Sequence, residues 1–251
     1  MKDYGFVVVH IPHASVHIPE FYRETILLDD NALAAEMQLM TDVFCDDLYD
    51  CGCFTNKLIA PVSRLVCDME RFRDDENEPN AKKGQGLMYT RTYDRRRLRK
   101  NDGGLRNLIL EEFYDPHHAA LTAMVDAATE KYGKCLIIDG HSFFEKSKKR
   151  NPDFDIGTDV FHTPAGLSEV LCGQVKELGY SVKVNTPFAG AITPMKHYRK
   201  DKHVFSVMIE VNRKLYVKGK SSFIKSRNYD IVKNDCAVIM KCAAEFVDNM
   251  M

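Results

Sequence analysis

The chain has 251 residues and a net charge of −1, because 35 lysines and arginines stand against 36 aspartates and glutamates. Since no overall field of either sign attracts nucleic acid or a membrane surface, we expect a partner to be recognised at a local site. The length is sufficient to bury a substantial core, and we expect a single domain over residues 1–251.

Strand-like and helix-like segments alternate along the chain, which predicts an α/β fold with a mostly parallel sheet and helices on both faces. Phe6 to Val9 is predicted to be the first strand. Asp29-Asp30 can cap a helix that has an apolar stripe. The stripe consists of Leu33, Met37, Met40, Phe44 and Leu48. Leu65 to Cys67 is predicted to be a second buried strand.

The middle of the chain contains two irregular segments. The charged segment from Arg71 to Arg99 has little apolar periodicity. Long excursions of this kind are usually either disordered or functional lids, and this segment is a candidate lid over the site. A helix is expected from Leu105 to Tyr132, bent at Pro116. The second irregular segment, Phe143 to Thr158, contains the basic run 146–150, which we expect to be a solvated loop.

The last part of the chain returns to regular structure. We expect a helix at Ser168 to Leu178, a strand at Ser181 to Val184, an alternating strand at Val204 to Val211 and an amphipathic helix at Asp230 to Asp248.

The cysteines and the N-terminal run bear on location. There are eight cysteines, but Cys67 and Cys135 lie in apolar runs and no Cys-x-x-Cys pair occurs. We therefore expect reduced thiols. Because Phe6 to Val9 is too short for a secretory leader or a membrane span, we predict a cytoplasmic protein.

Histidines follow two of the predicted strands. Cys135 to Ile138 leads into Asp139-Gly140-His141-Ser142, and Phe6 to Val9 leads into His10-Ile11-Pro12-His13. Ligands bind beyond the carboxyl ends of strands in open α/β sheets, and neutral imidazole is a common zinc donor. The two strand ends therefore predict a metal site. His10 and His17 are expected to be structural or to lie at its rim.

The third metal donor stays open among Asp42, Glu36, Asp68 and Asp139. Asp42 lies off the apolar stripe, but Thr41-Asp42 could equally cap a short helix that begins at Val43. Asp139 is two residues from His141 on a strand and so points to the same side, which favours a role in orienting a ligand.

Glu210 interrupts an otherwise apolar strand end. A buried acid without a partner is costly, so we expect it to be paired, with Arg213 as a candidate, or to act as a general base. Near a zinc-bound water, such a carboxylate can accept a proton and return it to the leaving group.

Several further residues could bind a substrate. Arg64, Arg71, Arg91 and Arg213 occur beside the candidate site elements, and arginine binds carboxylates bidentately, although each could equally be an ordinary surface ion pair. His118 is a candidate site residue, and its neighbour His117 is expected to be solvated. The small-residue run from Phe188 to Thr193 suits close approach of a substrate.

These segments together resemble the N-formylglutamate amidohydrolase (N-formylglutamate deformylase) family. The resemblance spans most of the chain. It is carried by Pro12-His13-Ala14-Ser15, Thr41-Asp42, Ser63-Arg64 through Asp68 and Arg71, His118-Ala119-Ala120-Leu121, Asp139-Gly140-His141-Ser142, Pro152-Asp153-Phe154-Asp155-Ile156-Gly157-Thr158, Asn185 to Thr193, and Ile209-Glu210.

The resemblance implies a three-layer α/β/α fold like that of zinc carboxypeptidases and zinc amidases. It implies one zinc ion, or another divalent metal, bound by His13, Asp42 and His141, with Glu210 as the base. Asp139 and Asp68 would orient the ligands. The implied substrate-binding residues are Arg64, Arg71, Arg91, Arg213, Asn185, Thr193 and His118.

The implied reaction is hydrolysis of N-formyl-L-glutamate to formate and L-glutamate, the closing step of one route of histidine degradation. Glu70 departs from the family pattern, in which asparagine is usual, and this leaves the substrate open. The alternatives are a zinc hydrolase of another small anionic N-acyl amino acid or of a small peptide, and a non-catalytic binding module. Neither nucleic acid nor a membrane is expected as a partner, and the sequence does not give the oligomeric state.

Overall fold

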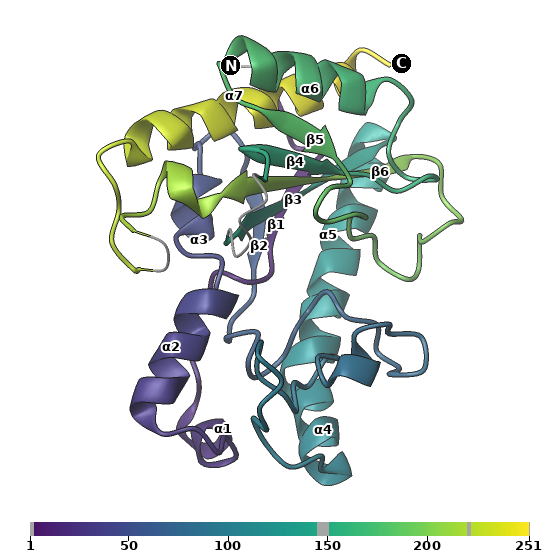
Figure 1. Cartoon of the computed structure of the whole chain (residues 1–251). Helices are drawn as coiled ribbons and strands as arrows, with labels where there is room; N and C mark the ends of the chain where they lie inside the picture. The colour runs from purple at the N-terminus through teal and green to yellow at the C-terminus, as the bar shows by residue number, and fades with distance from the viewer. Residues whose placement is uncertain (1–2, 145–150, 220–221, 251) are drawn as a thin grey trace. The chain divides into compact units, whose positions relative to one another are not determined.

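The computed structural model describes residues 3–144, 151–219 and 222–250, and its strands form one mixed sheet (Figure 1). In sheet order the strands are β2 (Asn56–Ile59), β1 (Val7–Ile11), β3 (Cys135–Phe143), β6 (Val204–Asn212), β4 (Phe154–Gly157) and β5 (Val182–Val184). β1, β3 and β6 run parallel at the centre, and β4 runs antiparallel to β6 and parallel to β5. The predicted α/β class with a mostly parallel sheet is therefore confirmed.

The helices alternate with the strands over much of the chain. They are α1 (Glu20–Glu24), α2 (Asp30–Met40), α3 (Cys45–Leu48), α4 (Gly103–Ile109), α5 (Asp115–Tyr132), α6 (Leu167–Glu177) and α7 (Tyr229–Asp248). The short helical turns are η1 (Ala81–Lys83), the π-helical η2 (Leu110–Tyr114) and η3 (Arg213–Leu215).

The chain divides into two compact units. The first, which we call the sheet unit, comprises Met1–Ile11, Phe44–Leu58 and Leu121–Met251. The second unit comprises Pro12–Val43 and Ile59–Ala120. The single domain over residues 1–251 stays a prediction.

In the sheet unit, α6 and α7 lie on one side of the sheet and the C-terminal part of α5 on the other (Figure 1). The α5 side is apolar near the beginnings of the strands. Its buried residues are Val8, Cys135, Ile137 and Val204 from the strands and Leu121, Val125 and Ala128 from α5. Because side chains alternate between the faces of a strand, the same face continues with residues 10, 139, 141 and 210.

The second unit contains the charged segment from Arg71 to Arg99, which is irregular apart from η1, as expected. It nevertheless contributes to a core, because Leu87, Tyr89 and Leu98 are buried. Its role as a lid stays a prediction.

Three predicted elements differ from the structure. Leu65 to Cys67 is buried but is not a strand, because the N–H groups of Val66 and Cys67 both donate to the carbonyl oxygen of Ser63 in a tight turn. The helix predicted to run to Leu48 stops at Met40, because Thr41 takes an extended conformation (ψ 136°), and Phe44 in a left-handed conformation (φ 63°) precedes the separate helix α3.

The third is the segment Phe143 to Thr158, which contains β4 and is not irregular throughout. The edge strand β2 was not predicted, because its residues are only partly buried and show no strong pattern. The basic run 146–150 lies outside the described residues.

The helix expected from Leu105 to Tyr132 is present as α4, η2 and α5 in succession. Its irregular part precedes Pro116, whose nitrogen cannot donate to the preceding turn. The helices and strands predicted after residue 166 are confirmed as α6, β5, β6 and α7.

The cysteine prediction was wrong at one place. Cys51 and Cys53 form a disulfide across Gly52, with their Cα atoms 5.5 Å apart, because the positive φ of the glycine folds the chain back. The other six cysteines are free thiols, as expected. Among the described helices, none combines the length and the apolar composition that a membrane span requires.

Candidate metal-binding and catalytic residues

The sheet unit carries a row of polar side chains on one face of three adjacent strands. His10 is opposite Asp139 in the β1–β3 register, and His141 is opposite Glu210 in the β3–β6 register. Neighbouring strands are about 4.8 Å apart, and opposite residues share a face. All four side chains are buried, with exposed fractions of 0, 0, 2 and 6% in the order His10, Asp139, His141 and Glu210.

Asp139 contacts both histidines of this row. Its Oδ1 lies 2.8 Å from Nδ1 of His10 and 3.3 Å from Nε2 of His141, and its Oδ2 accepts the backbone N–H of Ile192 at 3.2 Å. Burial alone would raise the pKa of Asp139, but His141 and His10 hold that pKa well below its usual range. The carboxylate therefore orients the His141 ring, which directs Nδ1 away from Asp139.

The backbone beside His141 is fixed by a tyrosine that the sequence did not single out. The Tyr49 hydroxyl donates to the carbonyl oxygens of His141 at 2.8 Å and Ile209 at 2.7 Å. A Cβ on Gly140 would lie 2.8 Å from Tyr49 Cδ2, so glycine is needed for the ring to pack against the strand. Tyr49 thus holds β3 and β6 in register.

In the second unit, His13 is held between three carboxylates. Its Nε2 lies 2.8 Å from Oδ1 of Asp68, and its Nδ1 lies 3.7 Å from Oδ2 of Asp42 and 3.7 Å from Oε2 of Glu70. The Asp42 N–H donates to the His13 carbonyl oxygen at 2.9 Å. Asp42 does not cap a helix, because α3 begins at Cys45 with Phe44 as its N-cap.

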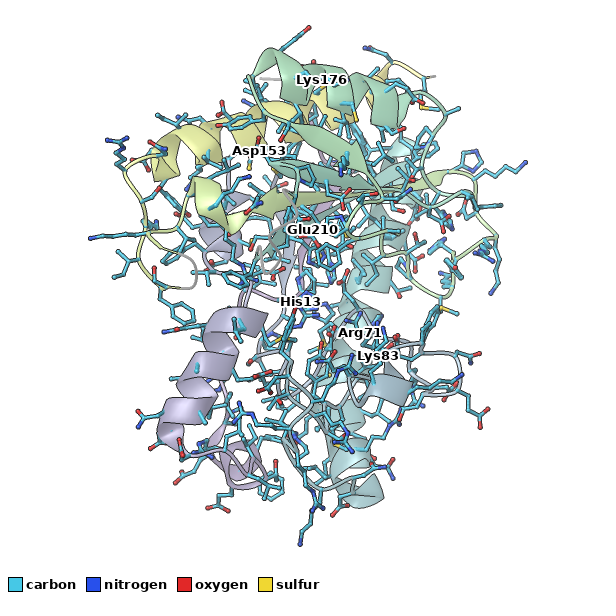
Figure 2. The ribbon with its side chains drawn as sticks, in the orientation of Figure 1. His13, Arg71, Lys83, Asp153, Lys176 and Glu210 are labelled. Atoms are coloured by element: carbon cyan, nitrogen blue, oxygen red, sulfur yellow. A yellow bond between two sulfur atoms is a disulfide. The ribbon has the colours of Figure 1, made fainter. Side chains whose placement is uncertain are left out.

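Two predicted substrate-binding arginines bind Asp68. Oδ2 of Asp68 accepts from Nη2 of Arg64 at 2.8 Å and from the Tyr89 hydroxyl at 2.6 Å, and Nη2 of Arg71 lies 3.5 Å away. Burial would raise the pKa of Asp68, but Arg64, Arg71 and His13 hold it well below its usual range. Figure 2 labels His13 and Arg71 of this cluster.

The donors around His13 fit a metal ion. When Nε2 donates its proton to Asp68, Nδ1 has a lone pair, and the carboxylates of Asp42 and Glu70 lie 3.7 Å from this nitrogen. Two ligand atoms of a tetrahedral zinc ion are about 3.4 Å apart, so the observed 3.7 Å needs little adjustment. His13 and Asp42 are both buried, and their nitrogen and oxygen donors suit zinc or another divalent transition metal.

The other predicted substrate-binding residues of the sheet unit lie near its strand ends. Arg213 is buried, and it donates through Nε to the Ser142 hydroxyl at 3.1 Å and through Nη2 to the Ser142 carbonyl oxygen at 3.2 Å. Thr193 is buried and donates to the Ser206 hydroxyl at 3.3 Å.

A buried acid positions the loop that contains Asn185 and Thr193. Asp155 accepts the N–H groups of Thr186 at 2.9 Å and Phe188 at 2.8 Å, and burial raises the pKa of Asp155 in spite of these bonds. Asn185 is exposed and exchanges two hydrogen bonds with Thr158. Asp155 was not singled out in the sequence.

The remaining candidates belong to the second unit. Arg91 is exposed and donates to the Arg95 carbonyl oxygen at 3.0 Å. His118 is partly buried, with Nε2 2.8 Å from the Met69 carbonyl oxygen. His117, expected to be solvated, is buried with an exposed fraction of 5%, because its side of α5 faces the interior.

Comparison with known proteins shows which family this chain resembles. Residues 6–217 match the model of a family described as N-formylglutamate amidohydrolase. The N-formylglutamate deformylase of Pseudomonas putida is 27% identical over 232 residues, which cover 86% of this chain and 84% of that protein.

Two crystal structures share the fold. The N-formylglutamate amidohydrolase from Ralstonia eutropha JMP134 superposes with a TM-score of 0.82 at 20% identity and covers 98% of this chain and 95% of its own. The gene product Atu2144 from Agrobacterium tumefaciens gives a TM-score of 0.67 at 17% identity, with 98% and 94% covered.

Proposed function

The chain belongs to the N-formylglutamate amidohydrolase family, and we propose that it hydrolyses N-formyl-L-glutamate to formate and L-glutamate with one bound zinc ion. It is a hydrolase that acts on an amide bond. A place in histidine degradation, in the cytoplasm, belongs to the same proposal.

The observation that supports the metal site best is the arrangement around His13. Its Nδ1 lies 3.7 Å from a carboxylate oxygen of Asp42 while Asp68 binds the opposite ring nitrogen. A metal-binding histidine commonly donates its other N–H to a carboxylate in this way. We assign His13 and Asp42 as two ligands.

His141 is the third proposed ligand, and Asp139 orients its ring in the same manner. Chain connectivity supports the set. His13 follows the last residue of β1 by two positions, so its Cα is at most about 7.6 Å from that of Ile11. β1 is the immediate neighbour of β3, which carries His141.

A zinc ion bound by these residues supplies Lewis acidity, which polarises the formyl carbonyl and lowers the pKa of a bound water. Glu210 is the proposed base. It is buried directly opposite His141 in the sheet. Its carboxylate accepts the proton of the attacking water and returns it to the amine of the departing glutamate. Asp68 and Asp139 keep the two histidines in the required orientation.

Positive groups near these residues suit a substrate with two carboxylates. Arg64 and Arg71 both form ion pairs with the carboxylate of Asp68, so that two guanidinium groups lie beside one acid. Arg213 is a second proposed carboxylate-binding group. Asn185, Thr193, His118 and Arg91 complete the proposed set.

The test is formate release from N-formyl-L-glutamate by the zinc-loaded protein, compared with N-acetyl-L-glutamate and N-formyl-L-aspartate. We expect turnover of the first substrate. Absence of formate from a protein that contains zinc would refute the proposed substrate, and turnover of either analogue would assign another N-acyl amino acid.

The role of Glu210 is tested separately with Glu210→Gln, with Glu177→Gln on the exposed surface of α6 as the control. The first variant is expected to retain zinc and to lose at least about 100-fold in kcat, and the control to match the unmodified protein. Retained turnover in Glu210→Gln would exclude Glu210 as the base.

A further inference from the structure

Glu70 lies as close to His13 as the proposed ligand Asp42 does. Oε2 of Glu70 and Oδ2 of Asp42 each lie 3.7 Å from Nδ1 of His13. The distance to Nδ1 of His13 therefore does not distinguish the two carboxylates.

A short turn fixes Glu70 at this position. The Glu70 N–H donates to Oδ1 of Asp68 at 3.1 Å, and the same oxygen binds Nε2 of His13. The Arg71 N–H closes the turn on the Asp68 carbonyl oxygen at 3.3 Å. Asp68 thus orients the histidine and positions the backbone of Glu70 at once, and the Glu70 side chain has an exposed fraction of only 18%.

The electrostatics of this arrangement favour a cation. A carboxylate oxygen of Asp42 and one of Glu70 lie 3.7 Å from Nδ1 of His13, the nitrogen that has a lone pair when Nε2 donates its proton to Asp68. Removing carboxylates from water is costly unless they are paired or coordinate a metal. A divalent ion at this point would have one nitrogen and two oxygens as donors.

We propose that Glu70 is a ligand of the metal ion in addition to His13, Asp42 and His141. This assignment rests on the proposed metal site and extends it from three protein donors to four. Catalytic zinc sites usually have three protein ligands and keep a position for water. With a fourth, the ion becomes at least five-coordinate when water binds, and the added carboxylate favours ions that accept oxygen-rich, expanded coordination, such as Mn²⁺ or Co²⁺.

Metal affinity tests the assignment without measuring turnover. The protein is freed of metal by a chelator and titrated with Zn²⁺ against a competing indicator, in parallel with Glu70→Gln, Glu70→Ala and Asp42→Asn. The control is Glu76→Gln, which removes an exposed charge from the same unit. Far-UV circular dichroism and thermal melts of the metal-free proteins show that each variant is folded.

We expect both Glu70 variants to lose at least about tenfold in Zn²⁺ affinity, as Asp42→Asn does, and the control to stay within about twofold. If Asp42→Asn weakens binding while both Glu70 variants stay within about twofold, Glu70 is not a ligand and the proposed function is unaffected. If Asp42→Asn also leaves affinity unchanged, the proposed metal site is wrong, and the assignment of Glu70 fails with it.

Substitution with Co²⁺ provides a second readout. Visible absorption bands of Co²⁺ are weak in five- or six-coordinate sites and much stronger in tetrahedral ones. The unmodified protein is expected to give weak bands, and Glu70→Ala stronger ones. Identical spectra for the two proteins would overturn the assignment.

Discussion

Replacing Asp68 with asparagine is expected to destabilise the protein markedly. The carboxylate is fully buried and forms ion pairs with Arg64 and Arg71. Removing one partner of a buried ion pair costs about 3–5 kcal/mol, because the remaining charge stays uncompensated. An unfolding entropy of about 2.1 cal/mol/K per residue gives about 0.5 kcal/mol/K for 251 residues. The melting temperature should therefore fall by about 6–10 °C.

The contribution of the Asp68 carboxylate to the stability of the folded protein should decrease in acid. Its pKa in the folded protein lies well below the usual value of 3.8, so the contribution of the charged form is fully present above that value. The contribution is lost as the pH falls below 3.8 toward the pKa of the folded state. The difference in stability between the unmodified protein and Asp68→Asn is thus constant near neutral pH and narrows in acid.

Thermal melts of both metal-free proteins, followed by circular dichroism over this pH range, measure the effect. The control is Asp94→Asn, which breaks the exposed ion pair with Arg96 and is expected to cost less than about 1 kcal/mol. A loss below about 1 kcal/mol for Asp68→Asn near neutral pH, or a difference that does not narrow in acid, would refute this account of the cluster.

Three further outcomes are expected. Gly157→Ala places a methyl group against the Gly190 carbonyl oxygen, and it should lower the free energy of unfolding by about 1–3 kcal/mol in thermal melts. If loop 185–193 binds the substrate, the variant should also raise KM. An unchanged KM would show that this loop does not bind the substrate. Tyr49→Phe removes the hydroxyl that is bonded to the His141 carbonyl oxygen, and it should lower the free energy of unfolding by about 1–2 kcal/mol. Zinc content, measured by elemental analysis, should be retained. Loss of zinc would show that Tyr49 is also needed for metal binding. Arg213→Lys should raise KM about tenfold at nearly constant kcat in steady-state assays, and an unchanged KM would remove this guanidinium from the substrate site.

Helices and strands with apolar residues on one face, and that face buried, could be predicted from the sequence. α7 and β6 match their predicted ranges within a residue at each end, because an amphipathic stripe and an alternating strand each indicate both a conformation and a buried face. Leu65 to Cys67 shows the limit of that reasoning. A short apolar run indicates that its residues are buried but does not indicate their conformation. Here hydrogen bonds to the Ser63 carbonyl oxygen form a buried turn instead of a strand.

The site could be predicted only where its residues are close in sequence. Asp139 and His141 share a strand face by their spacing, and the structure confirms that they interact. The position of Glu210 opposite His141 depends on strand register, which the sequence does not contain. Tyr49 was missed, and Glu70 was noted only as a departure from the family pattern, because their contacts arise from long-range packing and from a turn around Asp68.

In the sheet unit, one face of the sheet contains both apolar residues that pack against α5 and the row of buried polar residues near the strand ends. On β3, Cys135 and Ile137 pack beneath α5, and Asp139 and His141 continue the same face toward the strand end. Buried polar groups are tolerated only when they have partners. Asp139 meets this requirement within the protein through His10, His141 and a loop N–H. The orientation of His141 is therefore set by folding itself, before any ion or substrate binds.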